Sequence, residues 1–531
     1  MVKKMKINYK IFGLVMFVML VCCVSAASAA NVDNITVTDD TEVIEINDTV
    51  DSVGEVEIDE NDNSDDNPVT SSKAVTVTDT DYSKCFDSNG YLNDDAVTEL
   101  TFSGNFSAKS FGNFKINKTI PLNVAGATFN DVSFDLLADN LVLDGARFVY
   151  NSHGAVVYVD SNNDIVQNLN IVVNTPSTAD TFAILVENAN NVQILSNVIT
   201  YNASTANQNC YNHVIRVEGG KNVTVSRNNI TAYLPLKKVD FDQPYPSIYT
   251  DKVAGVAVQE SKDFKFTYNR LLVNVSCNNT DFPTLDAFII VGSEDAYIAH
   301  NTIIEIDNKT LQGNNNYLYA IDVYQCENIH IDNNTIFLNS SGGCIIPGTN
   351  NGTGAAYGIQ LTGGHSGVVI SNNNIRTSNN GPNCGIYSQN FIDETSLTII
   401  GNTIYVEGNA GDHEWSLVTG MELQDNVAYI ARNTITVVNK VAYTDDDNIY
   451  GISFSQYGTA EPRFEITNNT VVVINGKYAV YLQYSLNSLA YENCLYTDYY
   501  CGDDAVYENG DIVIFDNYCP YCDCTNCNCP H

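Results

Sequence analysis

Basic residues are scarce in this chain. Of its 531 residues, 25 are Lys or Arg and 63 are Asp or Glu, which gives a formal net charge of −38. Such a surface repels nucleic acid and anionic lipid, because both carry dense negative charge of their own. We therefore expect no nucleic acid among the partners of this protein.

Long apolar runs are also scarce. The longest lies at 11–24, where it follows a lysine-rich start and precedes several small residues, an order that is typical of a secretory signal. We predict that residues 1–30 are a signal peptide and that the mature protein is secreted. No later stretch holds 18 consecutive apolar residues, so we expect no transmembrane span after signal removal.

Positive charge is missing altogether from residues 31–72, which hold fourteen Asp or Glu and no Lys or Arg. Self-repulsion and a shortage of large apolar side chains predict an acidic disordered spacer. Acidic oxygens permit Ca²⁺ binding, but no loop with EF-hand or nonapeptide spacing is present, so we expect no cofactor.

What the sequence does contain is a repeat. An apolar residue, two further residues, Asn, one residue and another apolar residue recur about every thirty to forty positions, as in Ile194, Asn197 and Ile199. This spacing indicates one structural unit with variable insertions. The repeated asparagines are Asn197, Asn228, Asn269, Asn301, Asn334, Asn373, Asn402, Asn433 and Asn469.

Each repeated Asn follows a second element, a small residue with alternating apolar positions, as in Ala320-Ile-Asp-Val. Alternation with period two predicts short strands with one buried face. Three short strands cannot bury their inward side chains alone, whereas stacked copies about 4.8 Å apart can. The prediction is an all-β fold, a parallel β-helix of about twelve coils. The Asn would suit the corner between the second and third strands by tolerating a left-handed backbone, and its amide would form a ladder from coil to coil.

These patterns resemble the right-handed parallel β-helix repeat of the pectate-lyase-like superfamily. With the signal peptide and the acidic spacer, the chain is most similar to adhesin-like surface proteins of methanogenic archaea. The resemblance implies the fold, but not an activity, because lyases, hydrolases, epimerases and adhesins share this scaffold. The expected segments are a signal peptide at 1–30, a spacer at 31–72, an N-terminal cap with the first strands at 73–121, the β-helix at 122–490, and a Cys-rich tail at 491–531.

The resemblance also implies that binding residues stand on the outer face of the first strand and its flanking loops. The outward positions of that strand would form a lane of amides, hydroxyls and tyrosine rings, which suits sugar hydroxyls and stacked pyranose rings. The alternative is that Gln and Tyr only make side-chain stacks that stabilise the sheet. The predicted lane consists of Glu187, Arg216, Glu218, Gln259, Asp322, Tyr324, Gln360, Tyr387, Gln389, Glu422, Gln424, Tyr481 and Gln483.

Catalysis needs more than a lane. Glycosidases use two carboxylates about 5–9.5 Å apart, and only Glu187 with Glu218 occupies adjacent coils of the predicted lane. Arg216 beside them would keep both ionised, which favours a surface ion cluster. The catalytic motifs of polygalacturonases do not occur together in the sequence, and the calcium-binding residues of pectate lyases are absent from the lane. The sequence therefore predicts no catalytic residue and leaves enzymatic activity open.

The tail concentrates thiols. Two Cys-x-Cys and two Cys-x-x-Cys spacings could hold Zn²⁺ or Cu(I), whereas outside the cell disulfides are the commoner outcome. We favour disulfides and leave metal binding open. The five cysteines are Cys519, Cys522, Cys524, Cys527 and Cys529.

The sequence therefore favours a secreted, cell-envelope-associated, adhesin-like glycoprotein that binds cell-envelope, host or microbial glycans or surface proteins, or coats the surface, without catalysis. Several Asn-x-Ser/Thr sequons, such as those at Asn202 and Asn278, are candidate glycan sites. One alternative is a polysaccharide lyase, glycoside hydrolase or epimerase that acts on the outer face of the first strand. Another is a purely structural, glycosylated spacer.

Overall fold

The computed structural model describes residues 73–107, 112–175, 179–203, 210–238, 253–277, 283–308, 316–342, 354–390, 396–409, 417–424, 427–440, 448–455 and 463–519. Two compact units are distinguished, Met1–Val69 and Thr70–His531, and all described residues belong to the second. The predicted signal peptide and acidic spacer lie outside the described residues. No helix among the described residues has the length and apolar character needed to cross a membrane.

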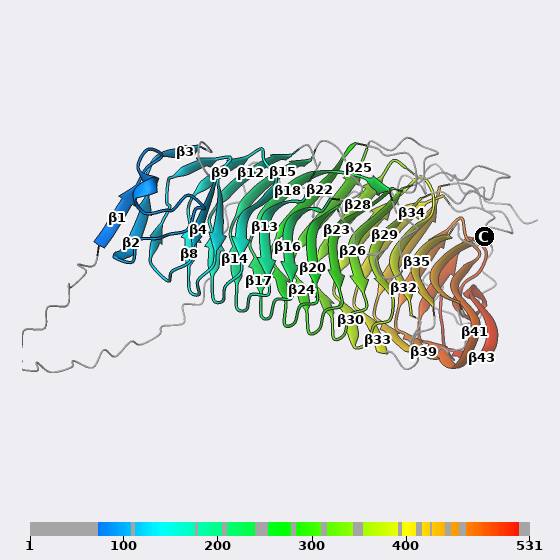
Figure 1. The fold of residues 1–531 in the computed structure, drawn as a ribbon. Coiled ribbons are helices and arrows are strands. Elements are labelled where there is room, and N and C mark those ends of the chain that lie inside the picture. The colour runs from blue at the N-terminus through cyan, green and yellow to red at the C-terminus, as the bar shows by residue number, and fades with distance from the viewer. Residues whose placement is uncertain are drawn as a thin grey trace, which may run out of the picture. The chain divides into compact units, whose positions relative to one another are not determined.

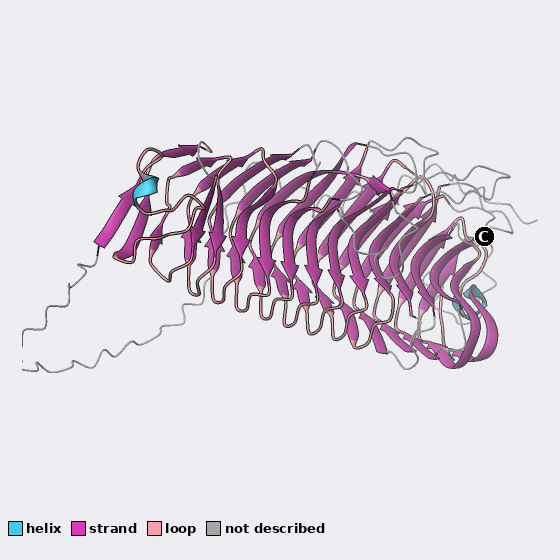
Figure 2. Ribbon diagram, viewed as in Figure 1, coloured by secondary structure: helices cyan, strands magenta, loops and turns pink. Residues whose placement is uncertain are grey.

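The unit from Thr70 onward is a right-handed parallel β-helix, as the repeat predicted (Figure 1). Its described residues are almost entirely strands and connecting turns, with two short 3₁₀ helices, η1 (Tyr82–Lys84) and η2 (Gly502–Ala505) (Figure 2). Each coil consists of three strands, and each strand pairs in parallel with its equivalents in the coils before and after it.

The first strands of successive coils form one face of the solenoid. In chain order these strands are β4 (Asn113–Ile116), β7 (Ser133–Leu136), β10 (Gly154–Val159), β13 (Thr181–Glu187), β16 (Asn212–Glu218), β20 (Val253–Gln259), β23 (Pro283–Val291), β26 (Tyr317–Tyr324), β29 (Ala355–Thr362), β32 (Asn383–Gln389), β35 (Leu417–Gln424), β38 (Asn448–Ser455), β41 (Tyr478–Tyr491) and β43 (Val506–Phe515).

The second strands are shorter and form the next face. They are β8 (Val142–Asp144), β11 (Ile165–Gln167), β14 (Gln193–Leu195), β17 (Thr224–Ser226), β21 (Lys265–Thr267), β24 (Tyr297–Ala299), β27 (His330–Asp332), β30 (Val368–Ser371), β33 (Ser396–Ile400), β36 (Val427–Ala431) and β39 (Arg463–Thr467). In the last two coils the first and second strands are continuous, so β41 and β43 belong to both faces.

The third strands form a sheet of fourteen strands among the described residues, close to the expected coil number. They are β3 (Asn105–Ser107), β6 (Thr128–Asn130), β9 (Arg147–Tyr150), β12 (Asn170–Thr175), β15 (Val198–Ala203), β18 (Asn229–Pro235), β22 (Arg270–Cys277), β25 (Thr302–Asp307), β28 (Thr335–Ser340), β31 (Asn374–Ser378), β34 (Thr403–Gly408), β37 (Thr434–Asn439), β40 (Thr470–Ile474) and β42 (Cys494–Thr497).

The Asn ladder runs along the corner between the second and third strands. Each ladder amide donates from Nδ2 to Oδ1 of the ladder Asn in the next coil, over 2.9–3.1 Å. The same Oδ1 accepts the backbone N–H of the preceding ladder Asn, over 2.9–3.0 Å. These side chains are at most 2% exposed, so the ladder satisfies backbone groups that water cannot reach.

One expectation about this corner is wrong. The left-handed backbone does not lie at the ladder Asn but at the residue before it, for example Arg227 and Tyr268, each with φ of 58°. Asn is therefore required for its amide, which both accepts and donates, and the bend itself is made by residues of many types.

The ladder also continues beyond the predicted β-helix boundary at residue 490. Asn469 donates to Asn493 and Asn493 donates to Asn517, over 3.0 and 2.9 Å, and Asn517 donates to the Asp503 carboxylate over 2.8 Å. Residues 491–519 thus belong to the solenoid rather than to a separate tail. The sequence pattern missed them because the last two coils lie only 24 residues apart.

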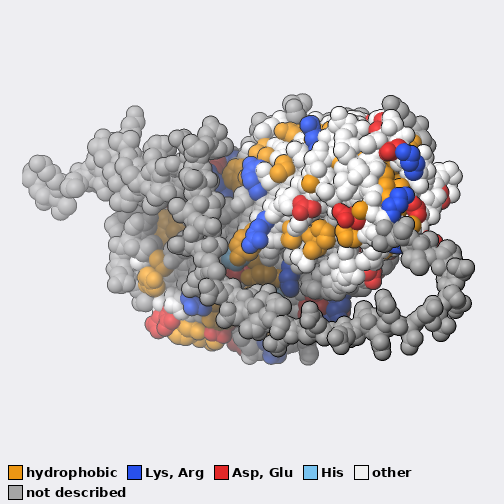
Figure 3. Space-filling model, turned by 90° about the vertical axis from the view of Figure 1, so that its left-hand side faces the viewer, with side chains coloured by type: hydrophobic (Ala, Val, Ile, Leu, Met, Phe, Trp, Pro, Cys, Tyr) orange, Lys and Arg blue, Asp and Glu red, His pale blue; other side chains and the backbone are white. Residues whose placement is uncertain are grey.

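The N-terminal end carries its own small sheet, β1 (Lys73–Val77), β2 (Val97–Phe102) and β5 (Leu122–Asn123). Beneath it, phenylalanine rings fill the first coils, and Phe102 packs on Phe114, Phe129 and Phe134 with centroids 5.0–5.8 Å apart. Figure 3 shows this end of the molecule, with hydrophobic, acidic and basic side chains interspersed. A capped end of this kind keeps the apolar interior away from water.

One short strand outside the coils is antiparallel: β19 (Lys237–Lys238) pairs with β23.

We predict that Asn334→Ala lowers the free energy of unfolding by at least about 3 kcal/mol, because Asn301, Asn373 and the Ile298 carbonyl lose buried partners together. The adjacent Asn333 is exposed and has φ of 54°, so Asn333→Gly should change the stability by less than about 1 kcal/mol. Denaturant midpoints measure both variants. Equal midpoints would contradict a stabilising role for the ladder.

Candidate functional site

The outer face of the first-strand sheet carries the polar side chains that the sequence predicted. The expected lane is in register from coil to coil, since Leu185 pairs with Arg216 and Glu187 pairs with Glu218. The column that contains Arg216 continues through Asp322, Gln360, Tyr387, Glu422 and Tyr481. The column that contains Glu187 and Glu218 continues through Gln259, Tyr324, Gln389, Gln424 and Gln483.

A third outward column was missed. In each first strand the small residue and the apolar residue after it both face the interior, as Ala287 and Phe288 do at 0% exposure. The strict alternation therefore shifts by one residue, and the position before the small residue also faces outward. This column consists of Phe182, His213, Ala254, Asp286, Tyr319, Tyr357, Cys384, Thr419, Tyr450 and Tyr478.

Burial divides the lane into open and closed parts. Asp322, Tyr324, Gln360, Glu422 and Gln424 are 1–7% exposed, so they are closed to a ligand in this state. The lane is therefore not one continuous groove. The predicted residues that are partly exposed are Glu187, Glu218, Gln259, Tyr387, Gln389, Tyr481 and Gln483, with Arg216 at 9%.

Tyrosine rings on this face stack mainly on one another. Tyr319 and Tyr357 lie 5.4 Å apart with an interplanar angle of 7°, and Tyr481 stacks on Tyr450 and Tyr507 at 4.4 and 4.6 Å. A ring whose faces are covered offers a ligand only its edge and hydroxyl group. These tyrosines favour the sheet-stabilising role over pyranose stacking.

The outer face also contains a shallow depression around Arg216, whose own side chain is 9% exposed. Arg216 lies over the ring of Tyr211, with the guanidinium carbon 4.5 Å from the ring centroid. Its Nη2 donates to Glu218 Oε2 over 2.7 Å and to Gln259 Oε1 over 3.3 Å. The remaining lining is His213, Ala257, Val258, Ile289 and Val291.

This depression combines an apolar floor with a fixed polar rim. Ala257 and Ile289 pack with Ala254 and Val291 in an apolar cluster separate from the main core. Above that floor, the planar groups of Arg216, Glu218 and Gln259 hold one another in place, so a ligand meets donors and acceptors that need little ordering. The guanidinium charge is offset by the Glu218 carboxylate, which makes the rim nearly neutral.

A second cluster lies in the next coils. Asp286 and Asp322 stand on adjacent first strands, at 0% and 4% exposure, with Tyr319 beside both. Burial raises the pKa of Tyr319 well above its ordinary value, and nearby Tyr357, Asp322 and Asp286 raise it further. The tyrosine therefore remains protonated at neutral pH. The sequence-predicted carboxylate pair, Glu187 and Glu218, is aligned in adjacent coils, but Glu218 is already paired with Arg216.

Glu422 is the centre of a third cluster. It is 5% exposed, and burial raises the pKa of its carboxyl group to about 7, while the hydrogen bond from Gln424 lowers the pKa in part. Gln424 also accepts from Gln389 over 2.9 Å, which gives a chain of amide and carboxyl groups across two coils. Burial and the nearby Glu422 also raise the pKa of the Cys384 thiol. Cys384 therefore remains a thiol rather than a reactive thiolate.

Among the described residues, no group of three or more His, Cys, Asp or Glu side chains is arranged to hold a metal ion. Of the five tail cysteines, only Cys519 is described, and it is 1% exposed. Cys522, Cys524, Cys527 and Cys529 lie outside the described residues. The choice between disulfide and metal therefore stays a prediction of the sequence.

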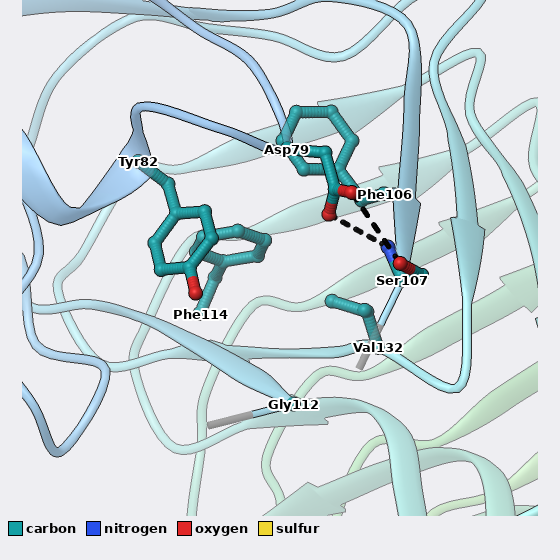
Figure 4. Close-up of a pocket in the computed structure, with 7 residues that line it drawn as sticks. All are labelled: Asp79, Tyr82, Phe106, Ser107, Gly112, Phe114 and Val132. Atoms are coloured by element: carbon teal, nitrogen blue, oxygen red, sulfur yellow. Dashed lines mark hydrogen bonds between the residues drawn. The ribbon is translucent and has the colours of Figure 1, made fainter. Parts of the chain in front are cut away.

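A further depression, of about 220 Å³, lies in the N-terminal cap (Figure 4). Phe106, Phe114 and Val132 contribute apolar walls, with the Tyr82 ring beside them. Its one carboxylate, Asp79, accepts from the backbone N–H and the hydroxyl of Ser107 over 3.0 and 3.3 Å. Because that carboxylate holds the cap together, the depression offers less to a ligand than the one at Arg216.

No protein-family model matches the chain, and no curated protein sequence matches it. Solved structures do resemble it. A periplasmic alginate epimerase, AlgG, has a TM-score of 0.40 at 9% identity over 83% of each chain. The Azotobacter vinelandii mannuronan C-5 epimerase AlgE6 A-module has a TM-score of 0.36 at 11% identity over 78% of this chain and 90% of that one. DFA-IIIase from Arthrobacter chlorophenolicus A6 has a TM-score of 0.37 at 7% identity, over 82% and 93%. These likenesses assign no role to any residue of this chain.

We predict that Glu422→Gln stabilises the protein at pH 8 and not at pH 4. Because the pKa of Glu422 is raised from 4.5 to about 7 on folding, its contribution to stability is complete below the unfolded pKa and is lost as pH rises through 7. By pH 8 that loss amounts to about 3 kcal/mol, and an uncharged amide avoids it.

Denaturant midpoints between pH 4 and pH 8 measure this difference. The exposed Glu508 provides the control, since Glu508→Gln should leave the shape of the pH curve unchanged. Parallel curves for the parent and the Glu422 variant would show that the buried carboxyl is not held neutral.

Proposed function

We propose that this protein binds carbohydrate on the outer face of its first-strand sheet, at the Arg216 depression. The observation that carries the proposal is the shallow depression in which the guanidinium of Arg216 is fixed by Tyr211, Glu218 and Gln259 above an apolar floor. Ligand sites of this kind, mostly apolar with a few oriented polar groups, are typical of small-molecule recognition.

The chemistry of the rim favours a neutral sugar. A pyranose has an apolar C–H face and a ring of hydroxyl groups that both donate and accept. The first would lie on Val291 and Tyr211, the partly exposed apolar side chains of the lining, and the second would meet the guanidinium, carboxylate and amide of the rim. An anionic sugar would have to compete with Glu218 for Arg216 and would face the net charge of −38.

The biological setting we propose is the cell envelope. The predicted signal peptide and acidic spacer support an extracellular protein held away from a surface, and the resemblance to adhesin-like surface proteins of methanogenic archaea supports a binding or coat role. The proposed partners are therefore envelope, host or microbial glycans, with surface proteins as the alternative.

We predict that Arg216→Ala weakens binding to an array of neutral oligosaccharides by about tenfold or more, because the variant loses three fixed hydrogen bonds from the rim. The measurement is glycan-array screening followed by calorimetry on each hit. Arg270→Ala is the matched control, since Arg270 is exposed on β22 of another face and should leave binding unchanged. If Arg216→Ala binds the same glycan as strongly as the parent protein, the ligand site lies elsewhere.

A second candidate function, polysaccharide cleavage, is favoured by the buried carboxyl pair that the fold assembles. Asp286 and Asp322 stand diagonally on neighbouring coils, roughly 8–10 Å apart at Cα, a spacing from which their carboxyl groups can flank one glycosidic bond. Because the two side chains are 0% and 4% exposed, cleavage requires that this part of the face opens when the polysaccharide binds. One carboxylic acid would protonate the leaving oxygen while the other, as carboxylate, takes a proton from the attacking water. The C–O bond to the leaving sugar breaks as the C–O bond to water forms.

For this second function we predict that the parent protein releases new reducing ends from a susceptible polysaccharide, and that Asp322→Asn and Asp286→Asn each reduce the rate by about a hundredfold or more. Reducing-end assays on a panel of neutral and acidic polysaccharides provide the measurement. Asp332→Asn, on β27 of the second-strand face, is the control. If no polysaccharide yields products while glycan binding is retained, the cleavage function is refuted and only the binding function remains.

A further inference from the structure

The last coil of the solenoid ends in an open strand edge. β43 pairs with β41 on one side, and no described strand pairs with its other side. Figure 1 shows β43 at the end of the stack, opposite to the cap at β1. The last eight of its ten residues, Glu508 to Phe515, are not buried: six of them are exposed and two are partly buried. An edge of this length presents a row of unpaired backbone donors and acceptors.

The side chains on this edge are unusually apolar for an exposed strand. Val513 is 53% exposed and Phe515 is 40% exposed, and Leu489 on the neighbouring strand is 36% exposed. The Phe515 ring stacks on Tyr491 at 5.1 Å, so it forms part of an ordered surface. Natural proteins protect such edges with charged side chains, Pro, a bulge or a covering segment. The first part of β43 carries Glu508 and Asp511, whereas Ile512–Phe515 contains no charged residue and no Pro.

The inward side of the same edge is also incomplete. Ile512 and Ile514 pack against the main core, yet both are only partly buried. A further strand placed beside β43 would cover them and extend the core by one layer. Within the described part of the chain, this edge therefore combines backbone groups that no strand pairs, an exposed apolar outer face and a partly exposed apolar inner face.

We propose that β43 pairs antiparallel with β43 of a second copy of this chain, so that two solenoids join end to end about a two-fold axis at Val513. In that register Asp511 faces Phe515, Ile512 faces Ile514 and Val513 faces itself. Every pair then joins side chains of the same face, as antiparallel pairing requires.

Charge disfavours one of the neighbouring registers. A two-fold axis moved by one residue to Ile512 would place Glu508 opposite Asp516, and like charges directly opposite destabilise a sheet. With the axis at Val513, no carboxylate faces another within the paired segment. The segment Ile512-Val513-Ile514 reads the same in both directions, so an antiparallel second copy places only apolar residues opposite one another there, and this is the reason for choosing a second copy as the occupant.

Long-range charge opposes the same association, because each chain carries a net charge of −38. Salt screens that repulsion, with a Debye length of about 8 Å at physiological ionic strength and about 3 Å at 1 M, while the apolar contact is not weakened. Self-association should therefore increase with salt, which is the reverse of an interface held by ion pairs.

The test is sedimentation velocity on the purified full chain over a concentration series, at physiological salt and at about 1 M NaCl. We expect a monomer–dimer equilibrium that shifts toward dimer at high salt. Val513→Lys should weaken dimerisation by about tenfold or more, because two ammonium groups would meet at the axis. Val198→Lys is the matched control, since Val198 is 47% exposed on β15 and should retain the dimer.

A cross-link identifies the partner strand. Under mild oxidation, Val513→Cys should yield a peptide joined through residue 513 of two copies, detected by mass spectrometry, because facing Cα atoms in an antiparallel pair lie about 4.5–5.5 Å apart. Val198→Cys should yield no corresponding peptide. A monomer at every concentration and salt, a dimer insensitive to Val513→Lys, or the absence of the 513–513 peptide would each overturn the proposal. Circular dichroism of both Lys variants verifies that the fold is retained.

Discussion

The structure depends on one requirement, that buried backbone groups at each corner of the coil find hydrogen-bond partners. Strands satisfy this requirement for one another by parallel pairing, but a corner has no ladder of its own. The Asn side chain solves the problem because one amide both donates and accepts. It accepts a backbone N–H and donates to a backbone carbonyl of the preceding coil, as Asn334 does with Asn301 N–H over 2.9 Å and the Ile298 carbonyl over 2.8 Å. A column of such groups therefore holds the coils in register along the solenoid.

The same stacking creates the candidate site. Because coils repeat at a fixed spacing, outward side chains from distant sequence positions form columns, and small changes in those columns produce separate environments. Arg216 lies in a shallow depression with a fixed polar rim, whereas Glu422 lies in a closed cluster where burial raises the pKa of its carboxyl group to about 7. Asp286 and Asp322 are brought together in a third environment. Recognition at the depression and chemistry at the closed clusters are thus distinct possibilities of one scaffold.

The two ends of the solenoid also differ for a physical reason. The N-terminal end has a small extra sheet and a cluster of phenylalanine rings, which cover the first coils. At the other end the Asn ladder stops at the Asp503 carboxylate, so the corner is satisfied, and no strand of the described part of the chain pairs with the outer edge of β43.

The sequence by itself determined the repeat, the three strands of each coil, the Asn ladder and the register of the lane, because these follow from local period and spacing. It did not reveal the column of Asp286 and Tyr319, since two successive inward residues interrupt the alternation. It also did not reveal the last two coils, whose ladder asparagines follow at intervals of 24 residues, whereas the nine predicted ones lie 29 to 41 residues apart. Only the tertiary structure decided which lane residues are open and which are buried. Exposure, the raised pKa of Glu422 and the rim around Arg216 arise from contacts between coils that no single stretch of sequence contains.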